Sequence, residues 1–127
     1  MTVAAKICGL TDAASVAAAV ENGAAYVGFV FYGRSPRNVT PEEAATLAAA
    51  VPAHVEKVGL FVDPDDALIR SVLDAVSLEW IQLHGSETPE RVAEIKQKFN
   101  RKFGQKLDQP NSLKDISRLS GYELKGL

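Results

Sequence analysis

The sequence predicts an α/β fold: a parallel (β/α) barrel of the TIM type, present as a partial barrel of about five strand–helix units. Short apolar, β-branched runs alternate with segments whose apolar residues recur every three or four positions, which is typical of a parallel sheet. Polar side chains stand at the ends of two predicted strands, opposite the apolar side. The chain has 127 residues, whereas a complete barrel needs at least ~200 residues.

Composition narrows the class of protein. A net charge of −2, with 46% hydrophobic and 24% charged residues, predicts one folded domain over residues 1–127. The lack of a basic excess argues against nucleic acid as a partner, and no apolar run is long enough to span a membrane. The single cysteine cannot form an internal disulfide, and the first residues lack an apolar leader, so we expect a cytoplasmic protein.

Four segments have the composition of buried strands, because each is rich in β-branched, aromatic or aliphatic residues. In order they are Val3–Cys8, Tyr26–Tyr32, Val58–Val62 and Trp80–Leu83. A fifth strand is due at Lys102–Leu107, but two lysines, a glutamine and a glycine make that segment a poor buried strand. Leu124–Leu127 resembles the opening of a sixth strand.

Helices are expected between these strands, and a further one from Ser112. Capping residues mark each start: Thr11 or Asp12, Thr40 with Pro41 and Glu43, Asp63 to Asp65, and Thr88 with Pro89. The expected buried positions are Ala13, Val16, Ala17 and Val20, then Ala44, Leu47, Ala48 and Val51, then Leu68, Ile69, Val72 and Val76, and finally Val92, Ile95 and Phe99.

Two parallel architectures fit these elements: a small doubly wound sheet and part of a barrel. Alternate residues of a strand face opposite sides, so Lys6 and Cys8 share one side of the first strand, and Gln82 and His84 share one side of the fourth. A doubly wound sheet buries both sides under helices and needs apolar residues on each. The polar side therefore favours the barrel.

Cys8 is the first candidate for chemistry. A lone buried cysteine commonly packs as a small apolar residue, but Cys8 ends a strand, precedes Gly9 and shares a face with Lys6. A neighbouring ammonium favours the thiolate that a general base or nucleophile needs. Both interpretations stay open on the sequence alone.

Other polar residues near strand ends have two interpretations each. Arg37 is either a solvated loop charge or a clamp for a carboxylate or phosphate, and His84 is either structural or part of the same site. His54 precedes a strand, at the opposite end of the sheet, and receives no role. Asp63 is interpreted as a helix cap. No metal-ligand spacing and no glycine-rich phosphate loop occurs in the sequence, so we expect neither metal nor cofactor.

Several motifs in one order carry a family resemblance: Lys6–Thr11, Gly23–Tyr32, Ser35–Arg37, Lys57–Val62 and Ile81–Gly85. From Ala5 to about Phe99 the chain resembles the phosphoribosylanthranilate isomerases of tryptophan biosynthesis. That family folds as a (β/α)₈ barrel and uses no cofactor. The resemblance implies an Amadori rearrangement of N-(5-phosphoribosyl)anthranilate to 1-(2-carboxyphenylamino)-1-deoxyribulose 5-phosphate.

The resemblance also implies residue roles. In the family a general acid protonates the furanose oxygen, the ring opens to a Schiff base, and a general base removes the proton at C2′. Cys8 matches the general base, and Arg37 matches the residue that holds the anthranilate part. Gln82 and His84 match positions that line the substrate pocket.

Some functional residues of the family have no match in this chain. Its general acid is an aspartate at the end of the sixth strand, which neither Asp108 nor Asp115 matches, and its phosphate site follows strands seven and eight. We therefore expect the 127-residue chain alone to be inactive. An open piece of barrel has two unpaired sheet edges, so self-association or pairing with a complementing chain is expected.

Two other functions were compared with the isomerase. A doubly wound, receiver-like binding module needs an acidic cluster after its first and third strands, where only Asp63 stands. A non-catalytic half-barrel that works only with a complementing chain has the same residues as the isomerase and differs from it in assembly alone.

Overall fold

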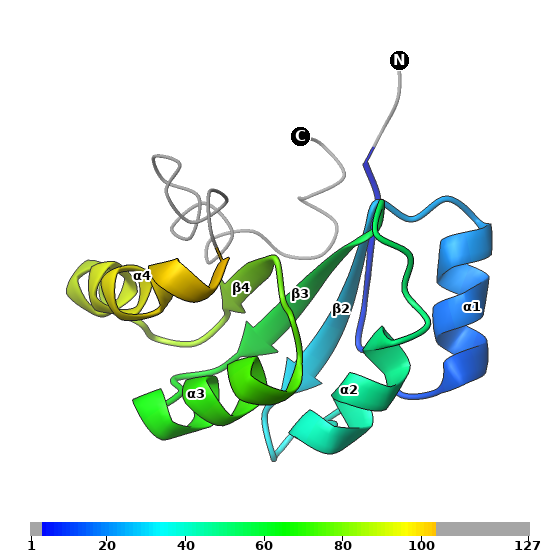
Figure 1. Cartoon of the computed structure of the whole chain (residues 1–127). Coiled ribbons are helices and arrows are strands. Elements are labelled where there is room, and N and C mark those ends of the chain that lie inside the picture. The colour runs from blue at the N-terminus through cyan, green and yellow to red at the C-terminus, as the bar shows by residue number, and fades with distance from the viewer. Residues whose placement is uncertain (1–3, 104–127) are drawn as a thin grey trace.

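The computed structural model describes residues 4–103, in which strands and helices alternate regularly (Figure 1). The strands are β1 (Lys6–Cys8), β2 (Tyr26–Phe31), β3 (Glu56–Phe61) and β4 (Trp80–Leu83), and the helices are α1 (Ala13–Glu21), α2 (Pro41–Ala48), α3 (Asp66–Ala75) and α4 (Pro89–Phe103). The first four expected strands are confirmed, and β4 has the predicted bounds.

The C-terminal predictions have a different outcome. Lys102 and Phe103, expected to open a fifth strand, continue α4 instead. The rest of that segment lies outside the described residues. So do the expected helix from Ser112, the expected strand at Leu124–Leu127, and both Asp108 and Asp115.

The strands form one parallel sheet in the order β1-β2-β3-β4. Cys8 is paired with Gly28, Gly28 with Val58, and Val58 with Trp80. A doubly wound sheet reverses its strand order at a switch point, whereas each strand here lies beside its neighbour in sequence. The order therefore excludes the doubly wound alternative for the described residues and is that of a barrel wall.

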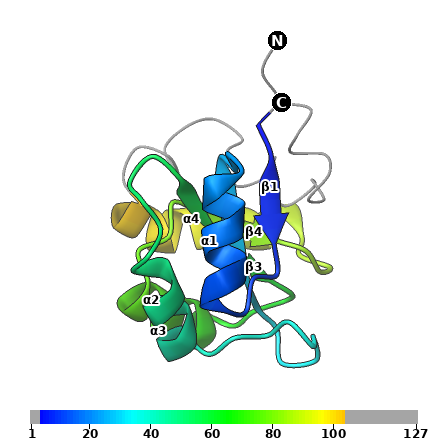
Figure 2. The same ribbon diagram turned by 90° about the vertical axis from the view of Figure 1, so that its right-hand side faces the viewer.

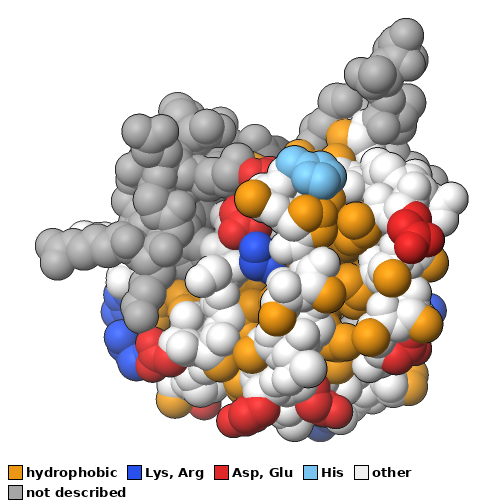
Figure 3. Space-filling model, turned by 45° about the vertical axis from the view of Figure 1, so that its right-hand side comes forward, with side chains coloured by type: hydrophobic (Ala, Val, Ile, Leu, Met, Phe, Trp, Pro, Cys, Tyr) orange, Lys and Arg blue, Asp and Glu red, His pale blue; other side chains and the backbone are white. Residues whose placement is uncertain are grey.

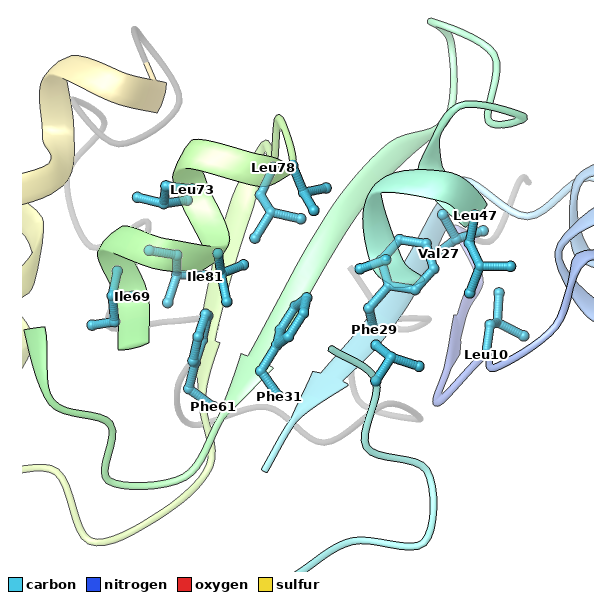
Figure 4. Packing of buried hydrophobic residues seen from close by; sticks show 14 of the residues in the cluster. Leu10, Val27, Phe29, Phe31, Leu47, Phe61, Ile69, Leu73, Leu78 and Ile81 are labelled. Atoms are coloured by element: carbon cyan, nitrogen blue, oxygen red, sulfur yellow. The ribbon is translucent and has the colours of Figure 1, made fainter. Parts of the chain in front are cut away.

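Helices α1, α2 and α3 lie along one side of the sheet (Figures 1 and 2). Between them and the strands lies the main core, drawn in part in Figure 4. The rings of Phe31 and Phe61 stack with centroids 5.4 Å apart. This helix-covered face of the sheet is made by Val27, Phe29, Phe31, Gly59, Phe61, Ile81 and Leu83.

Local capping signals of the helices were predicted well. Asp12 caps α1 by accepting from the Ser15 N–H at 2.7 Å, and Thr40 caps α2 in a capping box with Glu43. The predicted buried side of α1 was wrong in part: Val16 is buried as expected, but Ala13 and Ala17 are exposed and Ala19 is buried instead. Because alanine occupies most positions of α1, the spacing of apolar residues cannot fix which side packs inward.

The opposite, inner face carries polar side chains on β1 and β4, as predicted, and apolar ones, Val30 and Val58, on the two strands between them. Lys6 and Gln82 are both buried there, and Lys6 Nζ donates a hydrogen bond to Gln82 Oε1. The two residues belong to the first and fourth strands, which in a flat sheet would lie about 14 Å apart. Their contact requires the sheet to curve toward the inner face, as a barrel wall does.

The outer side of β1 is less covered than the rest of the sheet. Ile7 points to the helix side as expected, but its side chain is 42% exposed. Beside it, a groove of about 430 Å³ runs between β1 and α1, lined by Ala5, Leu10, Ala18 and Ala24 among others. Hydrophobic side chains are visible on this side of the molecule in Figure 3. Within residues 4–103, no helix is long and apolar enough to cross a membrane.

Candidate active site

The candidate site begins where β1 ends. Cys8 is the last residue of the strand and is half-buried. Gly9 then takes a φ of +81°, a conformation that glycine adopts without steric penalty. The N–H groups of Gly9 and Leu10 both donate to the carbonyl oxygen of Gly28, at 3.0 and 3.2 Å. These bonds hold the end of β1 against β2 and fix the position of Cys8.

Arg37 belongs to the loop after β2, and its side chain lies against Gly9, the residue after Cys8. The loop is folded by the hydrogen bond from the Arg37 N–H to Ser35 Oγ at 3.1 Å and by the bridge between Val30 and Asn38. A Cβ added to Gly9 would collide with Arg37 Cδ and would lie 3.2 Å from Arg37 Nη1. The guanidinium therefore lies over Gly9, the residue that follows Cys8.

Gly28 brings Cys8 and Lys6 together on the inner face. A Cβ on Gly28 would lie 3.0 Å from Cys8 Sγ and 3.2 Å from Lys6 Cε. The two side chains occupy the space that a larger residue would fill. Since Lys6 also contacts Gln82, three polar side chains from the two edge strands are connected across this face.

The ends of β3 and β4 are joined by a compact network of hydrogen bonds. Glu87 accepts from the N–H of Asp63 at 2.7 Å and from that of Gly85 at 2.8 Å, and Asp63 Oδ1 accepts from the Ser86 N–H at 2.9 Å. Asp63 has a φ of +44°, which is uncommon outside glycine. The network fixes the turn that follows His84.

Asp63 was wrongly interpreted as a helix cap. Asp65 caps α3, because its Oδ1 accepts from the Leu68 N–H at 2.8 Å. Asp63 links the two loops instead. The sequence could not separate these roles, since the partners Ser86 and Glu87 are more than twenty residues away along the chain.

His84 follows β4 directly, and its N–H donates to the carbonyl oxygen of Phe61 at 2.8 Å. His84 is exposed and lies at the same edge of the sheet as Arg37. His54 is also exposed and precedes β3, at the opposite edge. The structure thus brings Arg37 against Gly9, the residue after Cys8, and places His84 at the same edge of the sheet.

The charged groups with displaced pKa values lie outside this site. Hydrogen bonds from Lys98 and Arg91 hold the pKa of Asp66 below its usual range, and the Ser15 N–H lowers the pKa of Asp12. Lys98 Nζ lies 2.6 Å from Asp66 Oδ2, so the ion pair ties α4 to α3. Among residues 4–103, no group of three or more His, Cys, Asp or Glu side chains is placed to hold a metal ion.

A parallel sheet with sequential strand order, curved so that side chains of its first and fourth strands meet on the inner face, defines a (β/α)-barrel protein. The family model of N-(5′-phosphoribosyl)anthranilate (PRA) isomerase matches residues 5–122. The chain belongs to the PRA isomerase family.

Known proteins give the extent of the similarity. The chain is 66% identical over 96 residues to N-(5′-phosphoribosyl)anthranilate isomerase of Paracoccus denitrificans, covering 76% of this chain and 45% of that protein. It is 56% identical over 99 residues to the Paramagnetospirillum magneticum enzyme, covering 78% and 46%. The chain spans about half the length of the curated relatives it matches.

Solved structures agree with the fold. The Thermotoga maritima phosphoribosyl anthranilate isomerase superposes with a TM-score of 0.72 at 39% identity, covering 76% of this chain and 47% of that one. The Thermus thermophilus enzyme gives a TM-score of 0.69 at 32% identity, covering 74% and 47%. A further PRA isomerase, solved with reduced 1-(o-carboxyphenylamino)-1-deoxyribulose 5-phosphate, has a TM-score of 0.72. The partial TIM-type barrel predicted from the sequence is confirmed.

Proposed function

We propose that this chain supplies the proton-abstracting and anthranilate-binding half of a phosphoribosylanthranilate isomerase. The observation that carries the proposal is the placement of Arg37 over Gly9, one residue after Cys8. A thiol base and a guanidinium at one strand end suit a substrate with an acidic carbon and an aromatic carboxylate. Gln82 and His84, at the end of β4, are assigned to the same substrate site.

The roles follow from these positions. Cys8 removes the proton at C2′ of the ring-opened substrate. Arg37 holds the anthranilate carboxylate with two parallel hydrogen bonds, and this orients C2′ toward the thiolate. Gln82 and His84 contact the ribose part. The reaction is an internal redistribution of protons and electron pairs and uses no cofactor.

We further propose that residues 1–127 form a single barrel domain that is completed by a second piece of chain. The exposed Ile7 and the groove beside β1 support this arrangement, because a closed barrel packs a helix over the outer side of every strand. A polypeptide with the remaining strands of the barrel would cover that groove and supply the general acid and the phosphate site. Alone, the 127-residue chain is expected to be inactive, since lost general-acid catalysis typically lowers rates ~10²–10⁴-fold.

Isomerase turnover on phosphoribosylanthranilate, followed by fluorescence, tests the proposal. The chain is assayed alone and mixed with a polypeptide containing the part of the Paracoccus relative that follows the matched region. Activity only in the mixture, abolished by Cys8→Ala, supports a split barrel with the family's chemistry. Turnover by the pure chain at the rate of a complete relative would contradict the need for a second piece.

A non-catalytic half-barrel is the second candidate, and the exposed Ile7 and the groove beside β1 do not distinguish it from the isomerase. The same assay does. If the mixture associates but stays inactive, and Cys8→Ala leaves the association unchanged, the half-barrel interpretation replaces the enzymatic one.

A further inference from the structure

Lys6 is the buried charged residue that the roles above leave unused. It is only 6% exposed, and its Nζ donates to the neutral side chain of Gln82. None of the ion pairs formed within residues 4–103 includes Lys6. Burial of an ammonium without a counter-charge is unfavourable. The placement of Lys6 therefore calls for a functional explanation.

Gly28 fixes where Lys6 lies relative to the proposed base. Cys8 Sγ and Lys6 Cε lie 3.0 and 3.2 Å from the position of a Cβ on this glycine. The side chains thus meet over one point of β2, and the ammonium is one bond beyond Cε. A substrate carbon that approaches Cys8 Sγ closely enough to lose its proton brings its own substituents within reach of Lys6 Nζ.

We infer that Lys6 is a substrate-binding residue whose ammonium donates a hydrogen bond to the C2′ oxygen, an inference that rests on the proposed isomerase function. The Cys8 thiolate takes the proton from C2′. The C–H electron pair becomes the C1′=C2′ bond, and the π pair of the protonated C1′=N bond moves to the anthranilate nitrogen. The enol hydroxyl then loses its proton to water, C2′=O forms, and C1′ gains a proton, so no net oxidation occurs.

The physical benefit arises at the C2′ oxygen. Negative charge develops on this oxygen as the enol hydroxyl loses its proton, and a fixed cation in a site with little water stabilises that charge. An ammonium has three donors, of which Gln82 accepts one. Because an ammonium cannot accept, the contact also fixes Gln82 with its oxygen toward Lys6. Gln82 thereby orients the ammonium toward the substrate side of Cys8.

The test uses the chain mixed with the complementing polypeptide described above. Lys6→Met keeps the length of the side chain and removes the donor. We expect kcat/KM to fall about 10²–10³-fold, with most of the loss in kcat, as for the removal of one oxyanion donor. The control is Lys57→Met, because Lys57 is also a partly buried strand lysine, but it pairs with Glu79 at 3.3 Å. That variant should stay within about threefold of the unmodified mixture.

A ligand pair separates contact with the C2′ oxygen from a structural effect. The reduced product analogue carries an oxygen at C2′, and its 2-deoxy counterpart lacks it. Lys6→Met should weaken binding of the reduced analogue about tenfold or more, and should change binding of the 2-deoxy compound less than twofold. Equal weakening of both ligands, or of neither, would overturn the inference.

Folding is controlled by a second variant and by thermal unfolding. Lys6→Gln has a shorter, neutral side chain that can still form a hydrogen bond with Gln82. It should therefore fold even if Lys6→Met does not. Like Lys6→Met, it should weaken binding of the reduced analogue but not of the 2-deoxy compound. If the unmodified mixture is active while both variants match it, only the Lys6 inference is wrong. If the unmodified mixture neither turns over substrate nor binds the analogue, the proposed function is wrong and the inference is overturned with it.

Discussion

Gly28 and Gly59 lie in neighbouring strands and face opposite sides of the same sheet. A Cβ on Gly59 would lie 2.5 Å from Leu78 Cδ1 and 3.1 Å from the ring of Phe61, inside the apolar core. A Cβ on Gly28 would meet the thiol of Cys8 and the stem of Lys6. The helix-covered face thus provides packing, whereas the inner face provides room for polar groups. Most of the core packing and the proposed chemistry thus lie on opposite sides of the four strands.

The largest effect is expected from Phe29→Ala on the helix-covered face. Phe29 is fully buried between the sheet and its helices, and truncation of a buried phenylalanine lowers the free energy of unfolding by about 3–5 kcal/mol. Urea unfolding followed by circular dichroism measures the change. A loss below about 1 kcal/mol would show that the core does not depend on this ring, and the division between the two faces would fail.

The glycine pair tests the division directly. Gly59→Ala overpacks the core and should lower the free energy of unfolding by about 1–3 kcal/mol. Gly28→Ala should lower it by less than about 1 kcal/mol, because flexible side chains can move aside, yet it should reduce isomerase activity of the complemented enzyme at least ~10-fold by displacing Cys8 and Lys6. The opposite ranking, with Gly28→Ala the less stable and the more active variant, would contradict the assignment of the faces.

Much of the fold was predictable because its signals are local. The bounds of β4 and the capping box of Thr40 and Glu43 follow from residues adjacent in the sequence. Strand parity also placed Lys6 and Gln82 on the polar side. Their hydrogen bond was not predictable, since it depends on how far the sheet curves between strands that are 76 residues apart.

The same reasoning explains which part of the candidate site the sequence missed. Cys8 and Arg37 were chosen by residue type and by their position after strands. Gly9 was used as a sign that a strand ends, but the contacts of Gly9 with Arg37 and of Gly28 with Cys8 and Lys6 were not predictable, because the space beside each glycine is filled from other segments. Asp63 was misassigned for the same reason: its partner Glu87 belongs to the next strand–helix unit.

A comparison of three glycines distinguishes the effect of backbone strain at Gly9 from the effect of its contact with Arg37. Gly9 has a positive φ and Arg37 against it, Gly23 has a positive φ of +84° with open space, and Gly33 has neither. Alanine should lower the free energy of unfolding by about 1–2 kcal/mol at Gly9 and Gly23, and by less than about 0.5 kcal/mol at Gly33. Only Gly9→Ala should also impair anthranilate binding, because it displaces the guanidinium. Calorimetric titration with anthranilate or the reduced product analogue measures the affinity. If the three variants bind with equal affinity, Arg37 is not part of the binding site.

The smallest effect should come from the charges on the helix layer, where Asp66 joins α3 to α4. Lys98 and Arg91 lower the pKa of Asp66 from its usual value of 3.8. A carboxyl group whose pKa is depressed by folding stabilises the folded state above its unfolded pKa, and that contribution is lost as the pH falls through the folded value. Asp66→Asn should therefore lower the melting temperature slightly at about pH 7, and the difference should shrink as the pH falls below the unfolded pKa and through the folded pKa of Asp66. Lys98→Met, which removes the strongest partner, should show part of the same pH dependence. A melting-temperature difference that stays constant over this range would mean that Asp66 acts through helix capping or packing, and that the charged surface contributes nothing to the stability of the helix-covered face.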